Sequence, residues 1–178
     1  KIWVGTNKGM LVYKKKEKTI ASVESNSLYS SVITCLERLN KTTFLIGTKS
    51  KGVLIVKNEK INQILNDSAG LPSNLIRTIH VDNKGVIWVG TTKGISKVVL
   101  KPNHKAKVYN LSKKHGLISE EITSIKSIRD TLYVGTSKGL LTINRREIKI
   151  NRLHPSLYIK KVLINSIELS KDRLNQLT

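Results

Sequence analysis

Residues 85–94, GVIWVGTTKG, belong to a pattern that occurs four times along this chain of 178 residues. Each copy is an extended apolar run that ends in Gly-Thr, with a second glycine four or five positions after the first. The leading glycines are residues 5, 47, 90 and 135, so successive copies are 42, 43 and 45 residues apart. A regular period of this length is typical of a repeat protein. The shared positions are Trp3, Gly5, Thr6 and Gly9; Gly47, Thr48 and Gly52; Trp88, Gly90, Thr91 and Gly94; and Tyr133, Gly135, Thr136 and Gly139.

Each copy has the pattern of a β-hairpin. Alternating apolar residues favour a strand, and the second glycine suits the positive φ of a tight turn before the next apolar run. Further short strands precede and follow each hairpin, and four strands per period is the signature of a β-propeller blade. The sequence therefore predicts an all-β fold of four-stranded antiparallel blades, forming part of a propeller. The expected units are a partial blade over residues 1–25, then blades over about 26–66, 67–112 and 113–152, the last ending in a strand at 147–150.

The composition agrees with this fold and says little about partners. Hydrophobic residues make up 39% of the chain, and most are strand-forming Ile, Leu and Val. Trp3 and Trp88 occupy one repeat column, so we expect them to pack between blades. The formal net charge of +20 should attract polyanions at low salt, although a general bias toward lysine explains it equally well. The lysines are spread over every repeat and do not alternate with aromatic residues on one face, so nucleic acid is not an expected partner.

The sequence shows no catalytic or metal-binding constellation. Cys35 is the only cysteine, so no internal disulfide can form, and we expect a small buried strand residue there. The four histidines share no ligand spacing, and His80 is expected to be packed or to line a central channel. Asp82 and Asp130 fall in turns, where aspartate caps the local backbone. We therefore predict no metal, no cofactor and no enzymatic activity for this segment.

The third repeat resembles a known family. The string Gly70-Leu71-Pro72-Ser73-Asn74, followed by Ile76, Ile79, Asp82, Gly85, Trp88-Val89-Gly90-Thr91 and Gly94, is similar to the two-component-regulator propeller repeat. Residues 153–178 resemble the start of the immunoglobulin-like triple-tyrosine domain that follows the propeller in such receptors. The resemblance implies an extracytoplasmic, periplasmic sensor region of a membrane-anchored receptor of the sensor histidine kinase type. It also implies a response to an extracellular cue such as an oligosaccharide.

One face of the propeller is the expected ligand site. The loops that enter the first strand of each blade and the turns between second and third strands should share a face, and propeller ligands usually lie across such loops. An alternative is that this face meets another domain, or that the ligand site lies on blades outside this segment. The main candidates for ligand binding are Ser73, Asn74, Lys93, Ser119, Glu120 and Lys138, with Tyr29, Ser30, Lys49 and Lys51 on the same face.

Other functions remain open at this stage. The blades could form a scaffold for protein contacts without a small ligand, or the sensor region of a propeller-containing transcriptional regulator. A propeller enzyme such as a glycan lyase or hydrolase would need convergent acidic, His or Tyr groups, which the sequence does not show. The expected partners are the remaining propeller blades, a second copy in a homodimer, and an oligosaccharide or polyanionic ligand. Membrane contact is expected only through parts of the parent protein outside this segment.

Overall fold

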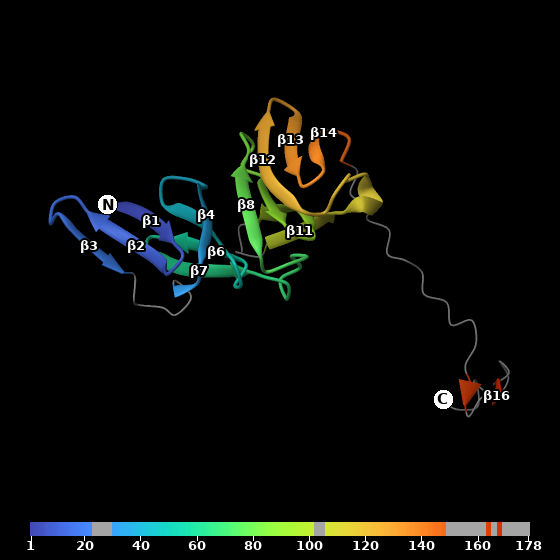
Figure 1. The fold of residues 1–178 in the computed structure, drawn as a ribbon, viewed down its shortest axis with the longest axis horizontal. Coiled ribbons are helices and arrows are strands. Elements are labelled where there is room, and N and C mark those ends of the chain that lie inside the picture. Colours follow the sequence, from blue (N-terminus) through green and yellow to red (C-terminus); the bar gives the residue numbers. More distant parts are fainter. Residues whose placement is uncertain (23–29, 102–105, 149–162, 165–166, 169–178) are drawn as a thin grey trace.

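The computed structural model describes residues 1–22, 30–101, 106–148, 163–164 and 167–168. Its sheets follow one another in sequence order, and each is built from strands that are consecutive in the chain (Figure 1). The first sheet contains β1 (Ile2–Thr6), β2 (Gly9–Lys14) and β3 (Thr19–Ser22). The second contains β4 (Ile33–Arg38), β5 (Thr43–Thr48), β6 (Val53–Lys57) and β7 (Lys60–Leu65).

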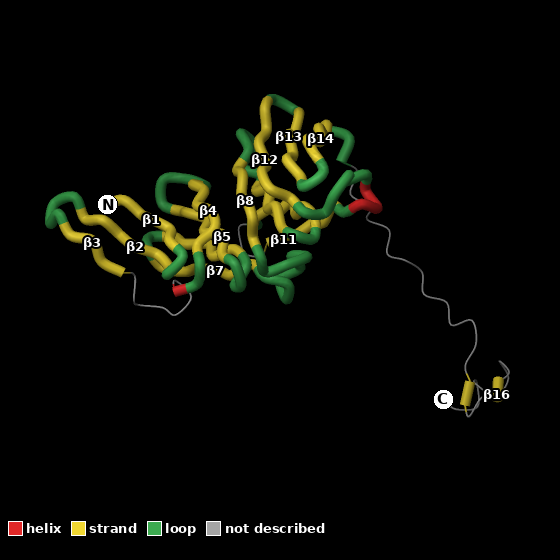
Figure 2. The backbone as a smooth tube through the Cα atoms, viewed as in Figure 1, coloured by secondary structure: helices red, strands yellow, loops and turns green. Residues whose placement is uncertain are grey.

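The third sheet contains β8 (Ile76–Val81), β9 (Ile87–Thr91), β10 (Gly94–Leu100) and β11 (Ala106–Leu111). A 3-10 helix, Lys113–His115, leads to the fourth sheet with β12 (Ile122–Ile128), β13 (Thr131–Thr136) and β14 (Gly139–Asn144) (Figure 2). All these neighbours pair antiparallel. The predicted all-β fold of propeller blades is confirmed.

The end of the chain differs from the expectation or lies outside the described residues. The fourth sheet has three strands among the described residues, because Glu147 lies in a turn and Ile148 has no regular structure. Residues 149–150 of the expected strand lie outside the described residues. Within 153–178 only β15 (Leu163–Ile164) and β16 (Ile167–Glu168) are described, as an antiparallel pair. The immunoglobulin-like domain therefore stays a prediction. No helix in the part of the chain that the structure describes has the length and hydropathy of a membrane span.

The Gly-Thr-x-x-Gly motif builds its turn with the threonine side chain. In the third repeat, Thr91 Oγ1 donates to the Gly94 carbonyl at 3.0 Å and accepts from the Lys93 amide at 3.0 Å. Gly94 has a φ of +112°, a left-handed conformation that residues with a Cβ rarely adopt. The same threonine-to-glycine bond occurs in the other three copies, at 2.8–2.9 Å. The motif is thus explained by local turn geometry.

In the first three repeats, the leading glycine of the motif lies where the next sheet packs. A Cβ on Gly90 would lie 2.6 Å from Thr78 Cγ2 of its own sheet and 2.7 Å from Ile122 Cγ2 of the following one. Gly5 meets Ile33 in the same way, and Gly47 meets Ile76. Glycine is therefore required because two neighbouring strands approach its Cα.

Buried apolar residues fill the space between successive sheets. Trp88, with 1% of its surface exposed, lies in the group between the third and fourth sheets with Ile95, Ile122 and Leu132. Trp3 stacks on Phe44 with 6.2 Å between ring centroids, across the first and second sheets. Because each sheet covers the face of the next, the blades stabilise one another in series. The larger group between the second and third sheets is Leu45, Val53, Ile55, Leu65, Leu71, Ile76, Ile79, Ile87, Val89 and Val98.

Candidate functional site

The loops predicted to carry ligand contacts lie together at one end of the sheets. The Gly52 amide donates to the Asn74 carbonyl at 3.0 Å, and the Gly94 amide donates to the Glu120 carbonyl at 2.7 Å. Each bond joins a turn between the second and third strands of one sheet to the loop entering the next sheet. In the fourth sheet, the Ser137 amide donates to the Glu121 carbonyl at 3.1 Å, which joins the turn to the loop entering the same sheet. The two sets of loops therefore share one face, which we call the loop face.

Four of the six main candidates use their side chains to hold these loops. Ser73 Oγ accepts from the Leu75 amide at 3.1 Å, and Asn74 Oδ1 accepts from the Asp67 amide at 2.9 Å. Ser119 Oγ accepts from the Glu121 amide at 3.2 Å and is 3.0 Å from Ser137 Oγ, whereas Glu120 Oε1 accepts from the Lys113 amide at 3.2 Å. A ligand that used these groups would have to share or replace these bonds.

Lys93 and Lys138 are differently placed. Both follow the threonine of the repeat motif by two positions and are exposed. Their backbone amides donate to Thr91 and Thr136, but among the described residues neither ammonium group is in an ion pair. These two side chains are the candidates on the loop face that remain available to a ligand. Lys49, Lys51 and Ser30 are exposed on the same face, and Tyr29 lies outside the described residues.

A second polar group crosses the first strands of three sheets. β8 lies between β4 and β12. His80 on β8 has its Nε2 2.8 Å from Ser127 Oγ on β12, and its Nδ1 lies 3.8 Å from Glu37 Oε1 on β4. The sequence pattern did not predict this convergence. The repeat pattern places Glu37 and His80 at equivalent positions, two residues after Cys35 and Thr78, but the equivalent residue of the fourth repeat is Lys126 and not Ser127.

The Glu37, His80 and Ser127 group is built as a contact between sheets. Its residue types are those of a hydrolase triad, but His80 Nε2 already accepts the Ser127 backbone amide at 3.0 Å. The Ser127 hydroxyl must share that single lone pair, and 3.8 Å is too long for a hydrogen bond from His80 to Glu37. These contacts position three sheets and do not activate a nucleophile.

Lowering the pH from about 7 to about 5 should destabilise the protein through His80. Burial, followed by the positive charge of Lys126, lowers the pKa of His80 below its ordinary value of 6.5, and the carboxylate of Glu37 opposes this only in part. The unfolded chain therefore binds the proton more readily, so the contribution of neutral His80 is present above pH 6.5 and is lost as the pH falls through the lowered value. Urea unfolding at a series of pH values measures this loss.

The variant that tests this prediction is His80→Gln. His80→Gln should flatten the dependence of unfolding free energy on pH between about 7 and 5, because the titrating group is gone. An unchanged slope in the His80→Gln variant would show that other groups titrate on unfolding in this range.

A third polar cluster closes the end of the third and fourth sheets opposite the loop face. Asp82 accepts from the Lys84 and Val86 amides at 2.9 and 3.0 Å and from Trp88 Nε1 at 3.1 Å. The turn-capping role predicted for Asp82 is confirmed by the first two bonds. Arg145, after β14, donates to the same carboxylate, and the side chains of Arg145 and Asp82 are only 8% and 2% exposed. Nothing in the sequence pattern marked Arg145.

Hydrogen bonds overcome the effect of burial on the Asp82 carboxylate. Burial by itself raises its pKa, but the bonds from Trp88, the two backbone amides and Arg145 together lower the pKa below the ordinary value of 3.8. Asp82 is therefore ionised and paired. The turn-capping role predicted for Asp130 is not found among the residues that the structure describes, where its carboxylate faces Arg146 and Lys84 instead. We refer to Arg145 and Asp82 as the latch between the third and fourth sheets.

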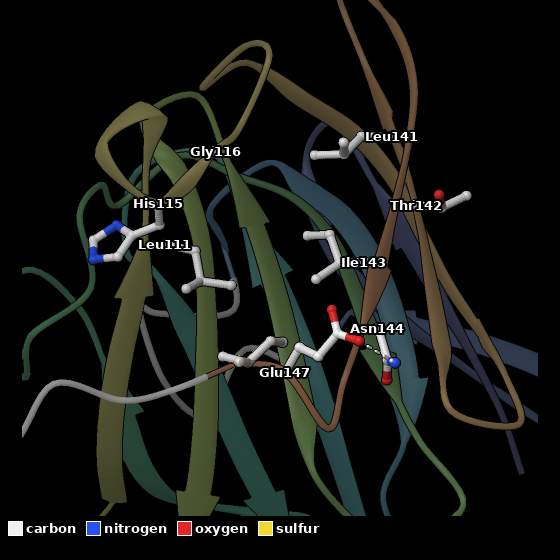
Figure 3. Close-up of a pocket in the computed structure, with 9 residues that line it drawn as sticks. Leu111, His115, Gly116, Leu141, Thr142, Ile143, Asn144 and Glu147 are labelled. Carbon is white, nitrogen blue, oxygen red and sulfur yellow. Dashed lines mark hydrogen bonds between the residues drawn. The ribbon is translucent and has the colours of Figure 1, made fainter.

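A cavity of about 410 Å³ lies beside the third and fourth sheets (Figure 3). Leu111, Leu141 and Ile143 line it, and Glu147 is held by Asn144 Nδ2 at 2.8 Å. His115 Nδ1 accepts from the Ser112 amide at 3.2 Å. The Glu147 carboxylate and the His115 ring are thus each held by a neighbour, so the cavity presents no acid and base poised on a common point. No group of three His, Cys, Asp or Glu side chains suited to a metal occurs among the described residues.

Comparison with protein families identifies the third repeat. Residues 70–93 match the family model described as "Two component regulator propeller". The matched residues run from the loop before β8 to the turn after β9 and include Asp82, Trp88 and Gly90. A comparison with curated proteins finds no match.

Solved structures share the fold of this chain. The extracellular domain of the putative hybrid two component system BT4673 from B. thetaiotaomicron is 20% identical with a TM-score of 0.65, over 82% of this chain and 21% of that one. The extracellular domain of the putative system BT3049 from the same organism is 20% identical with a TM-score of 0.58, over 86% and 20%. The computationally designed Ika4 protein is 16% identical with a TM-score of 0.53, over 80% and 83%. This chain thus spans about a fifth of the length of the two extracellular domains.

Proposed function

We propose, since residues 70–93 of this chain carry the two component regulator propeller repeat, that the chain is part of the ligand-sensing region of a two-component receptor. That match is the observation that carries the proposal. The shared fold with two extracellular domains of putative hybrid two component systems supports it. In this role the segment lies outside the cytoplasm, belongs to a membrane-anchored protein and passes a ligand-dependent rearrangement toward the output domain. A ligand can cause this rearrangement only if it binds one of two arrangements of the receptor more tightly than the other.

Further blades are the partners that the two ends of this segment would accept. Ile2 and Val4 on the first sheet are 56% and 44% exposed, and Leu140 on the fourth is 68% exposed. Gly5, Gly47 and Gly90 each meet an isoleucine of the following sheet, whereas Gly135 meets only Ser124 and Thr123 of its own sheet among the described residues. Exposed apolar faces on stacked sheets favour association. We propose that blades of the same protein, or a second copy in a homodimer, cover them.

The location of the segment can be tested in the full-length protein. A fusion of alkaline phosphatase after residue 148 should be enzymatically active in intact cells, because that enzyme matures only outside the cytoplasm. A β-galactosidase fusion at the same residue should be inactive. The reverse result would place the propeller in the cytoplasm and overturn the sensor proposal.

An oligosaccharide is the ligand class that we propose for the loop face. Replacing Lys93 and Lys138 together with alanine in the full-length receptor should raise the oligosaccharide concentration for half-maximal output by about five-fold or more, because each ammonium group can donate to sugar hydroxyls or acidic groups. Stability should change by less than about 0.5 kcal/mol, since both side chains are exposed. A reporter gene under the receptor's control measures the response to a panel of oligosaccharides.

The control for this experiment is the Lys15→Ala, Lys16→Ala variant, which removes the same charge from the turn between β2 and β3. Unchanged output from both variants would favour the scaffold alternative. One observation already favours that alternative: Ser73, Asn74, Ser119 and Glu120 use their side chains within the loops. In a scaffold, those bonds would hold the loop face rigid for contact with another protein domain.

A further inference from the structure

We propose that a cavity between the second and third sheets binds a small ligand bearing an oxyanion group: a carboxylate, sulfate or phosphate. The cavity has a volume of about 600 Å³, within the range of small-molecule sites. It is bounded by the turn between β4 and β5, by β6 and β7, and by the end of β10. These segments lie at the end of the sheets opposite the loop face. The inference therefore goes beyond the proposed sensor role and stands or fails separately from it.

Three lysines from separate segments line the cavity. Lys41 lies in the turn between β4 and β5, Lys57 ends β6, and Lys101 follows β10. No acidic residue lines the cavity, and none of the three ammonium groups is in an ion pair among the described residues. The acidic residue of the adjacent turn, Glu59, is bound to Lys1 at 2.8 Å. A cleft lined by charges of one sign concentrates the potential that attracts an anion.

The remaining lining groups suit an anion that also has an apolar surface. Leu39, Ile55 and Leu100 contribute apolar side chains, and Ile55 is 3% exposed. Asn40 Oδ1 accepts from the amide and hydroxyl of Thr42 at 3.0 and 3.2 Å, so its Nδ2 is the group left to donate. Three ammonium groups and a side-chain amide are donors, and charge-assisted bonds to an oxyanion are the strongest that they can make.

The residues at this cavity differ from those at the equivalent positions between the third and fourth sheets. The Leu39 amide donates to the Thr43 carbonyl at 3.0 Å, as the Asp82 amide donates to the Val86 carbonyl, so Leu39 and Asp82 hold equivalent positions. Leu100 likewise corresponds to Arg145, each six residues after the second glycine of its motif. Where the third and fourth sheets meet, Asp82 and Arg145 occupy these positions and form the internal ion pair of the latch. Between the second and third sheets an apolar pair replaces the latch, and the positive charge around it has no internal partner among the described residues.

Binding can be measured with defined probes on the 178-residue chain. Isothermal titration at about 0.15 M salt would compare a sulfated disaccharide, a glucuronate-containing disaccharide and inorganic phosphate, with maltose as the neutral probe. At least one anionic probe should bind with a Kd below about 1 mM, and maltose should not. A saccharide that binds better than phosphate would identify an acidic sugar as the source of the oxyanion, and the reverse would identify a phosphate.

The Lys41→Ala, Lys57→Ala, Lys101→Ala variant should weaken that binding by about ten-fold or more. The control variant replaces Lys15, Lys16 and Lys114, which are also exposed, and lowers the net charge of +20 by the same three units. It should weaken binding by less than about two-fold. Equal weakening in the two variants would show that the overall charge attracts the probe, and would overturn the proposal. So would the absence of binding by every anionic probe to the unmodified chain.

Discussion

Replacing Arg145 with methionine should lower the free energy of unfolding by about 3 kcal/mol, the largest loss that we expect from a single side chain. Methionine keeps much of the apolar stem but removes the guanidinium from Asp82. The carboxylate would stay buried, with its remaining bonds from Trp88 and two backbone amides. Removing one partner of a buried ion pair is strongly destabilising because the other charge loses its compensation.

Arg146→Met is the matched control for this variant. Arg146 also reaches a carboxylate, that of Asp130, but its side chain is 75% exposed. An ion pair this exposed contributes little to stability, so this variant should be close to the unmodified protein. Urea unfolding at neutral pH compares the two variants. A similar loss of unfolding free energy in both variants would mean that burial does not determine how much the latch stabilises the protein.

The latch also has a signature in acid. Because the pKa of Asp82 is lowered on folding, its contribution is present above its ordinary value of 3.8 and is lost as the pH falls through the lowered value. The unmodified protein should therefore lose stability below about pH 4. The Arg145→Met variant should lose less over the same interval, since one of the bonds that lowers the pKa is already missing.

Replacing Gly90 with alanine should lower the free energy of unfolding by about 1–3 kcal/mol. The new methyl group would lie 2.6 Å from Thr78 Cγ2 and 2.7 Å from Ile122 Cγ2, so one of the two sheets must move. Backbone strain is not the cause, because Gly90 has no positive φ. A strand residue with a Cβ would otherwise be favoured over glycine. The loss would therefore report the close approach of two successive sheets.

Gly85→Ala separates packing from backbone conformation. A Cβ on Gly85 would meet nothing within 4 Å, but the φ of +74° is left-handed. We expect Gly85→Ala to lower the free energy of unfolding by about 1 kcal/mol. Adding Thr78→Ser removes one of the two methyl groups that the new Cβ of Gly90→Ala would meet. In thermal unfolding, this second substitution should partly restore the stability of Gly90→Ala and should not restore that of Gly85→Ala. A Gly90→Ala protein as stable as the unmodified one would contradict the packing explanation.

Local features of the fold could be predicted from sequence because they repeat. The four Gly-Thr motifs indicated hairpins, and Asp82 was recognised as a turn cap, since in both cases the bonds lie within a few residues. The approach of Ile122 to Gly90 was not foreseen. It joins two repeats, and a periodic pattern shows that blades stack without showing which atoms meet.

The polar contacts between sheets were the part that sequence could not supply. Arg145 and Asp82 are 63 residues apart, and His80 meets Ser127 across 47 residues. Ser73 was chosen as a ligand residue by its position in a loop, but its hydroxyl accepts the Leu75 amide two residues away. A short polar side chain in a loop has backbone groups within reach, so position alone does not separate ligand binding from loop structure. The lysine-lined cavity was also missed, because its lysines come from three segments.

The most direct test of the sensor proposal is the sequence of the intact reading frame on both sides of this segment. The account predicts an apolar span of about 20 residues and, on its far side, a histidine kinase or a DNA-binding output domain. Such a frame would join a propeller with a two component regulator repeat to a signalling output across a membrane. A frame without a membrane span, or one that couples these blades to a catalytic domain on the same side, would contradict it.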